Sequence, residues 1–154
     1  MAIDYEYIKT IMCEVPQFDQ LTPEELDTLS KHVTHRNVPA GTVLCKEGSL
    51  GDSLYYVVDG KIEIRKESVD GRQTVLARFN KGGSVGEMSL VENSPRSATA
   101  TAVEDAELLI LRKDSFEKIL ESAPHIGIKI LKNISLSLST RLRHTSGRFA
   151  DIFK

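Results

Sequence analysis

Glu87 and Arg96 carry opposite charges in a stretch rich in small and apolar residues, GGSVGEMSLVENSPRSATATA. Arg96 offers a planar fork of N–H donors, which suits phosphate better than the point charge of a lysine. Gly86 precedes EMSLV, which is long enough for one helical turn, and the start of such a turn presents unpaired N–H groups to an anion. Ser97 adds a hydroxyl and Ala98 a small side chain beside a usable N–H. The stretch therefore predicts a phosphate site.

Glu87 indicates what else the ligand carries. A carboxylate repels phosphate, but it only accepts hydrogen bonds, so it suits a hydroxyl close to the phosphate, such as a ribose 2′-OH. Phosphate and ribose in one compact site predict a nucleotide. In the alternative reading, Glu87 and Arg96 form a structural salt bridge and the glycines make an ordinary turn. The sequence has neither the GK[ST] of a P-loop nor a GxGxxG motif between a strand and a long helix.

The bulk composition predicts one domain over residues 1–154, because 154 residues with 40% hydrophobic content can bury a core. A net charge of -2 and a pI of about 6.1 give no overall attraction to nucleic acid or to an anionic membrane. With neither a membrane-length apolar run nor a secretory signal, the chain is expected to be cytoplasmic. Cys13 and Cys45 lack partners at metal-ligand spacing, so no metal site is expected.

The residue pattern along the chain changes twice, from helical to β-rich and back to helical. Thr22, Pro23 and Glu25 form a capping box that predicts a helix over residues 22–33, preceded by a shorter amphipathic segment. From residue 35 to about 111, short β-rich runs alternate with Gly, Asp and Asn. About eight such strands predict a barrel, a sandwich or a jelly roll rather than a parallel α/β sheet.

The end of the chain is expected to be helical. Asp114 or Ser115 is expected to cap one helix, and Pro124 to open a longer one over about residues 125–145. Five apolar side chains of the longer helix are expected on one face: Ile128, Leu131, Ile134, Leu138 and Leu142.

Two stretches carry a family resemblance. The first is GEMSL followed by PRSAT, and the second is VLCKEGSLGDSLYYVVDGKIEI; together they span about residues 43–102. They resemble the phosphate-binding cassette and the glycine-turn signature of the cyclic nucleotide-binding domain family, known from the protein kinase A regulatory subunit, cyclic nucleotide-gated channels and the bacterial catabolite activator protein. The resemblance implies a mainly β fold, an eight-stranded, jelly-roll-like β-roll over residues 35–112. N-terminal helices over 1–34 and C-terminal helices over 113–154 would flank it.

The resemblance also implies a role for each residue of the cassette, here residues 85–99. Glu87 would accept from the ribose 2′-OH, and Arg96 would bind the exocyclic phosphate oxygens. Ser97 and the Ala98 amide would complete the phosphate shell, and Val85 stands where phenylalanine is common in the family. The backbone amides that would bind phosphate or ribose belong to Gly86, Glu87, Met88 and Ser89.

The implied ligand is cyclic AMP or cyclic GMP. Ser97 is similar to the serine of the bacterial activator, whereas several cyclic GMP-selective members have threonine there, so cyclic AMP is preferred. In the family, the residue that covers the base comes from the C-terminal helix or beyond. The candidates here are Arg141, Arg143, His144, Phe149 and Phe153. In the alternative reading, these side chains are simply part of a solvated helix end.

The expected function is a regulatory sensor rather than an enzyme, because no nucleophile, base and orienting group can be assembled from the site and the four histidines are scattered. Ligand binding is expected to pull on the junction near residues 111–116, so that the C-terminal helices repack. The partners considered are a second copy bound through the C-terminal helix, or an unknown effector protein, with no direct binding to nucleic acid or membrane. The alternatives are a β-roll interaction module that has lost its ligand and a fragment of a larger transcription regulator.

Overall fold

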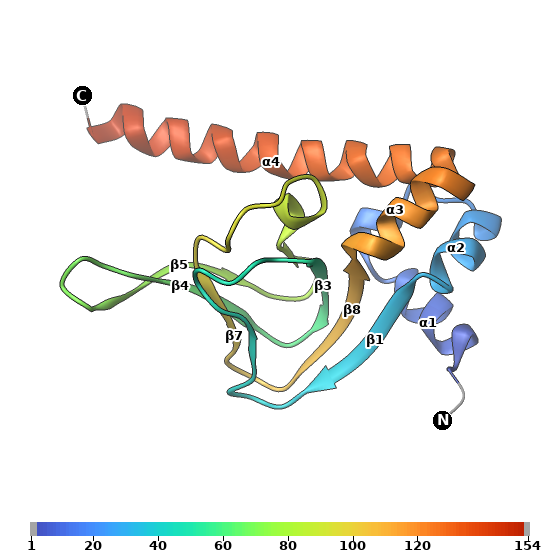
Figure 1. Cartoon of the computed structure of the whole chain (residues 1–154), viewed down its shortest axis with the longest axis horizontal. Coiled ribbons are helices and arrows are strands. Elements are labelled where there is room, and N and C mark those ends of the chain that lie inside the picture. The colour runs from blue at the N-terminus through green and yellow to red at the C-terminus, as the bar shows by residue number, and fades with distance from the viewer. Residues whose placement is uncertain (1–2, 153–154) are drawn as a thin grey trace.

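Two antiparallel four-stranded sheets form the body of the protein, as described by a computed structural model for residues 3–152 (Figure 1). One sheet has the strand order β1-β8-β3-β6 and the other β2-β7-β4-β5. The predicted eight-stranded β-roll with helices at both ends is confirmed. The strands are β1 (Val33–Val38), β2 (Val43–Cys45), β3 (Ser53–Asp59), β4 (Ile62–Glu67), β5 (Gln73–Phe79), β6 (Ser84–Val85), β7 (Thr99–Ala102) and β8 (Ala106–Arg112).

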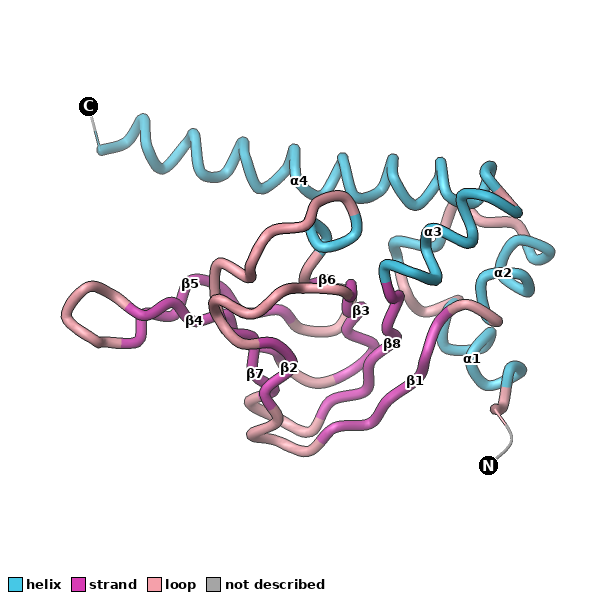
Figure 2. The backbone as a smooth tube through the Cα atoms, in the orientation of Figure 1, coloured by secondary structure: helices cyan, strands magenta, loops and turns pink. Residues whose placement is uncertain are grey.

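Helices flank the roll, and a single 3-10 turn interrupts it between β6 and β7 (Figure 2). Strand β6, next to that turn, did not stand out from the sequence because two residues are too few to show an alternating pattern. The helical elements are α1 (Tyr5–Met12), η1 (Pro16–Phe18), α2 (Pro23–Ser30), η2 (Glu87–Leu90), α3 (Lys113–Ser122) and α4 (Pro124–Ile152).

The capping box of α2 is present as predicted. The Thr22 side chain accepts from the Glu25 N–H, and the Glu25 carboxylate accepts from the Thr22 N–H. The helix ends at Ser30 rather than near Val33, because Val33 starts β1 and pairs with Leu111 of β8.

The first sheet separates two apolar cores, and its central strand β3 is buried on both faces. Leu54, Tyr56 and Val58 face the core shared with the helices. Tyr55 and Val57 face the core between the sheets. This alternation follows from the two-residue period of a strand, and it fixes the helices on one side of the sheet and the ligand-accessible roll on the other.

Strand β8 leads directly into α3, so the predicted Asp114 or Ser115 cap is wrong. The helix begins at Lys113, the cap position is Arg112, and no side chain caps the first turn. The Asp114 carboxylate instead accepts from the Ser115 N–H at 2.8 Å.

Helix α4 is longer than expected and runs across the roll (Figure 1). Its buried face consists of Ile126, Ile130 and Ile134, spaced by four residues. The predicted face is therefore partly wrong: Leu131 and Leu138 pack at the edge of this core, but Ile128 and Leu142 are 52% and 67% exposed. Ile128 is two residues from Ile126 and from Ile130, which places it on the opposite side of the helix.

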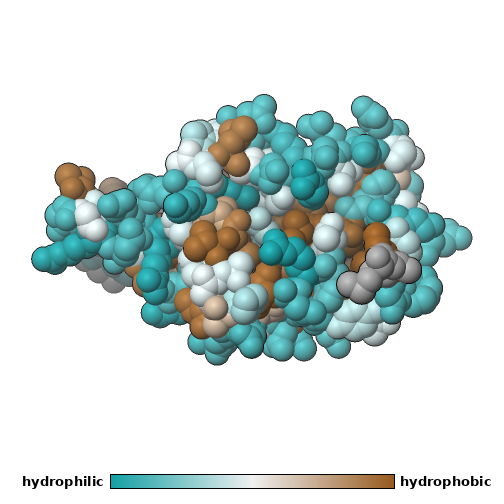
Figure 3. Space-filling model, turned by 60° about the horizontal axis from the view of Figure 1, so that its bottom comes forward, coloured by the Kyte–Doolittle hydropathy of each residue, from teal (hydrophilic) through white to brown (hydrophobic). Residues whose placement is uncertain are grey.

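The face of the molecule shown in Figure 3 is mostly hydrophilic, and its hydrophobic side chains lie in separate patches. Scattered apolar side chains are ordinary on a protein surface. None of the helices within residues 3–152 has both the length and the apolar character that crossing a membrane requires.

Candidate ligand-binding site

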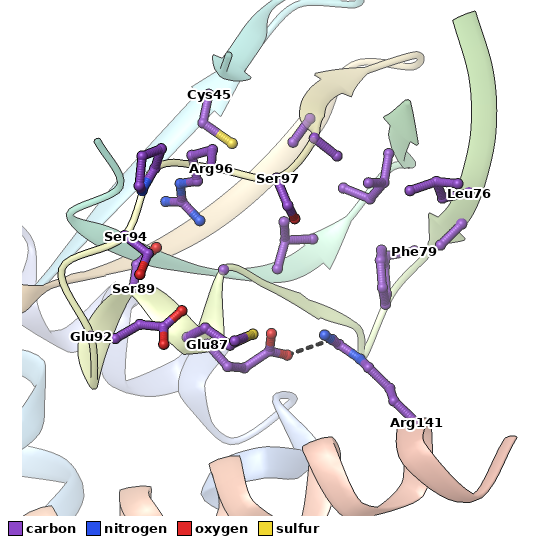
Figure 4. A pocket seen from close by; sticks show the side chains of 18 residues that line it. Cys45, Leu76, Phe79, Glu87, Ser89, Glu92, Ser94, Arg96, Ser97 and Arg141 are labelled. Carbon is purple, nitrogen blue, oxygen red and sulfur yellow. Dashed lines mark hydrogen bonds and ion pairs between the residues drawn. The ribbon is translucent and has the colours of Figure 1, made fainter. Parts of the chain in front are cut away.

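A pocket of about 410 Å³ opens between the turn after β6, the segment before β7, strand β5 and helix α4 (Figure 4). The structure brings all eight residues selected from the sequence to its lining. They are Val85, Gly86, Glu87, Met88, Ser89, Arg96, Ser97 and Ala98.

Gly86 shapes one wall of this pocket. Its φ of 92° is in the left-handed region, and it precedes the predicted single turn, which is the 3-10 helix η2. A Cβ atom at this position would lie 2.4 Å from Nη1 of Arg96 and 2.8 Å from the Ser53 carbonyl oxygen. The site therefore needs glycine both for its backbone conformation and for the space that the arginine occupies.

Arg96 is held by backbone groups rather than by an acid. Its Nη2 donates to the Ser53 carbonyl at 2.8 Å, and its own N–H donates to the Ser49 carbonyl at 2.7 Å. A Cβ at Gly51 would lie 2.4 Å from Nε of Arg96, so a second glycine leaves room for the guanidinium.

The charge of Arg96 is left uncompensated by protein groups. Within residues 3–152 it makes no ion pair, and its buried Nε has no hydrogen-bond partner. The salt bridge to Glu87 that the sequence left open is therefore not formed. A guanidinium that is positioned but unpaired at a pocket wall has the charge and the donors to suit an anion.

Glu87 is buried, with 2% of its surface exposed, and it is paired with α4. Its Oε1 accepts from Ser84 Oγ at 2.6 Å, from Arg141 Nη2 at 2.6 Å and from Ser137 Oγ at 3.4 Å. These donors and the ion pair offset the cost of burying a carboxylate. None of the described residues donates to Oε2. Glu87 thus binds the helix through one oxygen and keeps the other for a further donor.

Arg141 brings α4 to the pocket. Its Nη2 also donates to the Ser84 carbonyl at 3.0 Å, and its guanidinium carbon lies 5.2 Å from the centre of the Phe79 ring. A cation over an aromatic face is attracted by the ring quadrupole. Figure 4 shows the side chain reaching from α4 toward Glu87.

Arg141 is the one described candidate for covering the base that lines the pocket. Arg143, His144 and Phe149 are exposed and lie outside the lining, and Phe153 is outside the described residues. The sequence named Arg141 as a candidate, but its pairing with a carboxylate 54 residues away had no local signal.

The sequence missed the apolar half of the pocket. Leu76, Ala77 and Phe79 of β5 contribute to it, and the polar side chains missed at the rim are Glu92 and Ser94. Ala77 and Phe79 share a face at strand spacing, which the pattern of β5 could have indicated. The other apolar lining residues not selected from the sequence are Cys45, Ile64, Pro95 and Ala100.

Tyr56 of β3 lies near the buried carboxylate. Burial, and to a smaller extent the charge of Glu87, raises the pKa of Tyr56 above its usual range. Its hydroxyl therefore stays neutral and adds no second negative charge to this side of the site.

The side chains that line the pocket are cations, carboxylates, hydroxyls and apolar groups. The lining includes no histidine, and within residues 3–152 no three His, Cys, Asp or Glu side chains are grouped to hold a metal. A cation, a carboxylate oxygen and an apolar wall together fit a ligand with a phosphate, a hydroxyl and a flat apolar part.

Comparison with known proteins agrees with this description. The family model described as "Cyclic nucleotide-binding domain" matches residues 35–123. The chain is 35% identical to the cyclic AMP receptor protein of Thermus thermophilus over 83% of this chain and 57% of that protein. It is 27% identical to a CRP-like cAMP-activated global transcriptional regulator of Mycobacterium tuberculosis over 92% of this chain and 62% of that protein. The chain thus spans about three fifths of the length of these relatives.

A solved structure shows the same fold over most of both chains. It is a cyclic nucleotide-binding domain from Methylobacillus flagellatus, with a TM-score of 0.82 at 26% identity, covering 96% of this chain and 83% of that one.

Proposed function

Because the chain belongs to the cyclic nucleotide-binding domain family, we propose that residues 1–154 act as one regulatory domain whose ligand is cyclic AMP. The observation that carries this proposal is Arg96, a positioned guanidinium without an acidic partner in the described part of the chain. Arg96 is half-buried, and a partly desolvated cation without a counter-charge is unfavourable unless a ligand supplies one. A cyclic phosphate is an anion of suitable size and charge.

The ligand is proposed to lie with its phosphate at Arg96 and its ribose at Glu87. Ser97 and the Ala98 amide complete the phosphate shell, and the amides from Gly86 through Met88 to Ser89 face phosphate or ribose. The ribose 2′-OH donates to Oε2 of Glu87, the oxygen that no described residue uses. The base then lies toward the apolar wall of Ile64, Leu76 and Phe79, with Arg141 at its edge.

Cyclic AMP is preferred over cyclic GMP on two grounds. Ser97 stands where several cyclic GMP-selective members have threonine, and the names of the two relatives above include cyclic AMP. The relatives are regulators, and we extend this to the chain as a binding module without catalytic activity. The unpaired Cys13 and Cys45 fit a reducing compartment, and the proposed location is the cytoplasm.

Signalling is proposed to work through the position of α4. Glu87 is where the ligand and the helix meet, because it would hold the ribose through Oε2 while it holds Arg141 through Oε1. Arg141 also neutralises a carboxylate that would otherwise repel the phosphate. The ligand then binds the arrangement with α4 docked better than one with α4 released, and it shifts the population toward docking.

The partner that receives the signal is proposed to be a second copy of the chain, bound through α4. Leu138, Leu142, Thr145, Phe149 and Ile152 are spaced by alternating steps of four and three, the repeat of a coiled-coil seam. Leu142, Phe149 and Ile152 are exposed. A measurement of oligomeric state tests this choice of partner. If it shows no second copy, the alternative partner is an effector protein bound to the same surface.

A second candidate function is the ligand-binding part of a larger transcription regulator. The name of the Mycobacterium tuberculosis relative favours it, together with the 62% of that protein that the chain spans. A β-roll module that has lost its ligand is less well supported, because it has no use for an uncompensated Arg96.

Calorimetric titration of the wild-type protein with cyclic AMP, cyclic GMP and 5′-AMP tests the proposal. Saturable binding of cyclic AMP, tighter than that of the other two, is expected. Absence of binding of both cyclic nucleotides would contradict the proposed function, and tighter binding of cyclic GMP would contradict only the choice of base.

A further inference from the structure

Lys113 connects three segments of the chain at the phosphate end of the pocket. It is the first residue of α3 and directly follows β8. Its backbone N–H donates to the Asp52 carbonyl at 2.8 Å. Its Nζ donates to the Glu92 carbonyl at 3.3 Å and to Asn93 Oδ1.

The first contact reaches the segment that holds Arg96. Asp52 lies between Gly51, whose missing side chain makes room for the guanidinium, and Ser53, whose carbonyl accepts from Nη2 of Arg96. The backbone of Lys113 therefore supports the wall against which the arginine rests.

The second contact reaches the other side of the site. Glu92 follows η2, and its N–H donates to the Met88 carbonyl at 3.0 Å. Glu92 and Asn93 are exposed, and few other described contacts hold them. The ammonium group of Lys113 thus ties the segment after η2, here residues 92–93, to the first turn of α3.

Beyond Lys113, α3 is packed tightly against α4. Phe116 and Ile119 of α3 are in the same buried core as Ile126 of α4 and Leu90 of η2. A Cβ at Gly127 would lie 2.4 Å from Cδ2 of Leu120, so the two helices are in close contact at the start of α4. A displacement of the first turn of α3 is therefore passed on to the start of α4.

We propose that Lys113 is a positioning residue that couples the phosphate end of the pocket to α3, separately from the contact between Arg141 and Glu87. A ligand that binds Arg96 orders residues 92–93 against Lys113 and thereby fixes the first turn of α3. This inference rests on the proposed function, and it assigns the phosphate and the ribose to two different routes into the C-terminal helices.

The test compares Lys113→Met, which keeps the aliphatic chain and removes the ammonium, with Lys113→Arg, which restores N–H donors. Lys118→Met is the matched control, because Lys118 is an exposed lysine of the same helix outside the pocket lining. Amide hydrogen exchange is followed with and without saturating cyclic AMP, and affinity by calorimetry. A hydrogen bond of this kind contributes on the order of a fivefold change in an equilibrium constant.

Lys113→Met is expected to bind cyclic AMP within about fivefold of wild type. Its ligand-induced gain in protection over residues 113–119 is expected to fall to less than about half, while the gain around Arg141 is kept. Lys113→Arg restores the gain over residues 113–119, and Lys118→Met leaves it unchanged. The inference is overturned if the gain in protection over residues 113–119 is as large in Lys113→Met as in wild type. It is also overturned if the gain around Arg141 falls by as much as the gain over residues 113–119.

A ligand-free comparison separates this inference from the proposed function. The amides of residues 92–94 are expected to exchange about fivefold faster in Lys113→Met than in wild type or Lys118→Met. If wild type binds no cyclic nucleotide, the proposed function and the ligand-dependent coupling both fail. If the ligand-free exchange is unchanged in Lys113→Met, the tether itself is refuted even when cyclic AMP binds.

Discussion

Nη2 of Arg141 lies 2.6 Å from Oε1 of Glu87, a contact that joins the C-terminal helix to the centre of the pocket across 54 residues of sequence. Glu87 is almost fully buried, whereas 42% of the Arg141 side chain is exposed. The acid is therefore buried in the roll, and the helix supplies the more exposed partner.

Arg141→Ala tests whether this contact favours the ligand or competes with it. We expect cyclic AMP affinity to fall about tenfold, because the unpaired Glu87 charge then repels the phosphate. The ligand-induced protection of residues 137–141 should be lost as well. Calorimetry and amide exchange measure the two effects.

Arg143→Ala is the control for that experiment, since Arg143 is an exposed arginine of the same helix that does not line the pocket. It should bind like wild type. Tighter binding by Arg141→Ala would mean that the arginine occupies ligand space, and the docking account of α4 would be wrong.

A second prediction concerns the ribose hydroxyl. Wild type should bind 2′-deoxy cyclic AMP about 10- to 100-fold more weakly than cyclic AMP, because a hydrogen bond to a charged acceptor is lost. Glu87→Gln should shrink that difference, and it should weaken cyclic AMP binding less than loss of Arg96 does, because an amide oxygen still accepts from the hydroxyl. Equal affinities of wild type for the two nucleotides would contradict the proposed hydrogen bond between the ribose 2′-OH and Glu87.

The third prediction separates backbone strain from the shape of the site. Gly86→Ala should lower the free energy of unfolding by about 1–3 kcal/mol, because φ is positive there, and should also displace Arg96 and abolish tight binding. Gly71→Ala is the matched control, since Gly71 has a φ of 84° and a Cβ there would meet nothing within 4 Å. It should lose about 1 kcal/mol in denaturant unfolding and keep full affinity. Full affinity in Gly86→Ala would contradict the proposed position of Arg96.

The fourth prediction concerns the anchor at the start of α4. Nζ of Lys129 donates to Glu25 at 2.7 Å, and this contact, followed by the Thr22 N–H, lowers the pKa of Glu25. A lowered carboxyl pKa contributes stability above the unfolded pKa, and that contribution is lost as the pH falls through the folded pKa. Lys129→Met should therefore be less stable than wild type at neutral pH, and the difference should shrink in acid.

Denaturant unfolding at neutral and acidic pH measures this difference, with Lys132→Met as the exposed control on the same helix. The control should match wild type at both pH values. A deficit of Lys129→Met that persists unchanged in acid would show that Glu25 is not its source.

Local chemistry explains how much the sequence could predict. The capping box of Thr22 and Glu25 and the turn at Gly86 are signals a few residues long, and both elements formed where expected. The eight lining residues selected from the sequence, Val85–Ser89 and Arg96–Ala98, were found together because one continuous segment supplies them.

The contacts of α4 were not predictable in the same way. Its direction depends on Ile126 and Ile130 in the core and on the close approach of Gly127 to Leu120. That packing decides which side chain of α4 reaches Glu87. The apolar pattern of α4 does not show where β6 and the turn after it lie relative to the helix. The expected face was partly wrong for the same reason, because half of the helix passes beyond the core that would define a buried side.

The central claim is that the pocket binds a cyclic nucleotide through Arg96. Its most direct test is a calorimetric titration of cyclic AMP into Arg96→Ala, with wild type and Arg143→Ala measured beside it. Removing one partner of a desolvated charge pair costs about 2 to 5 kcal/mol, so affinity should fall about 30-fold to a few thousand-fold. Arg143→Ala should match wild type. Binding by Arg96→Ala within about threefold of wild type would contradict the account.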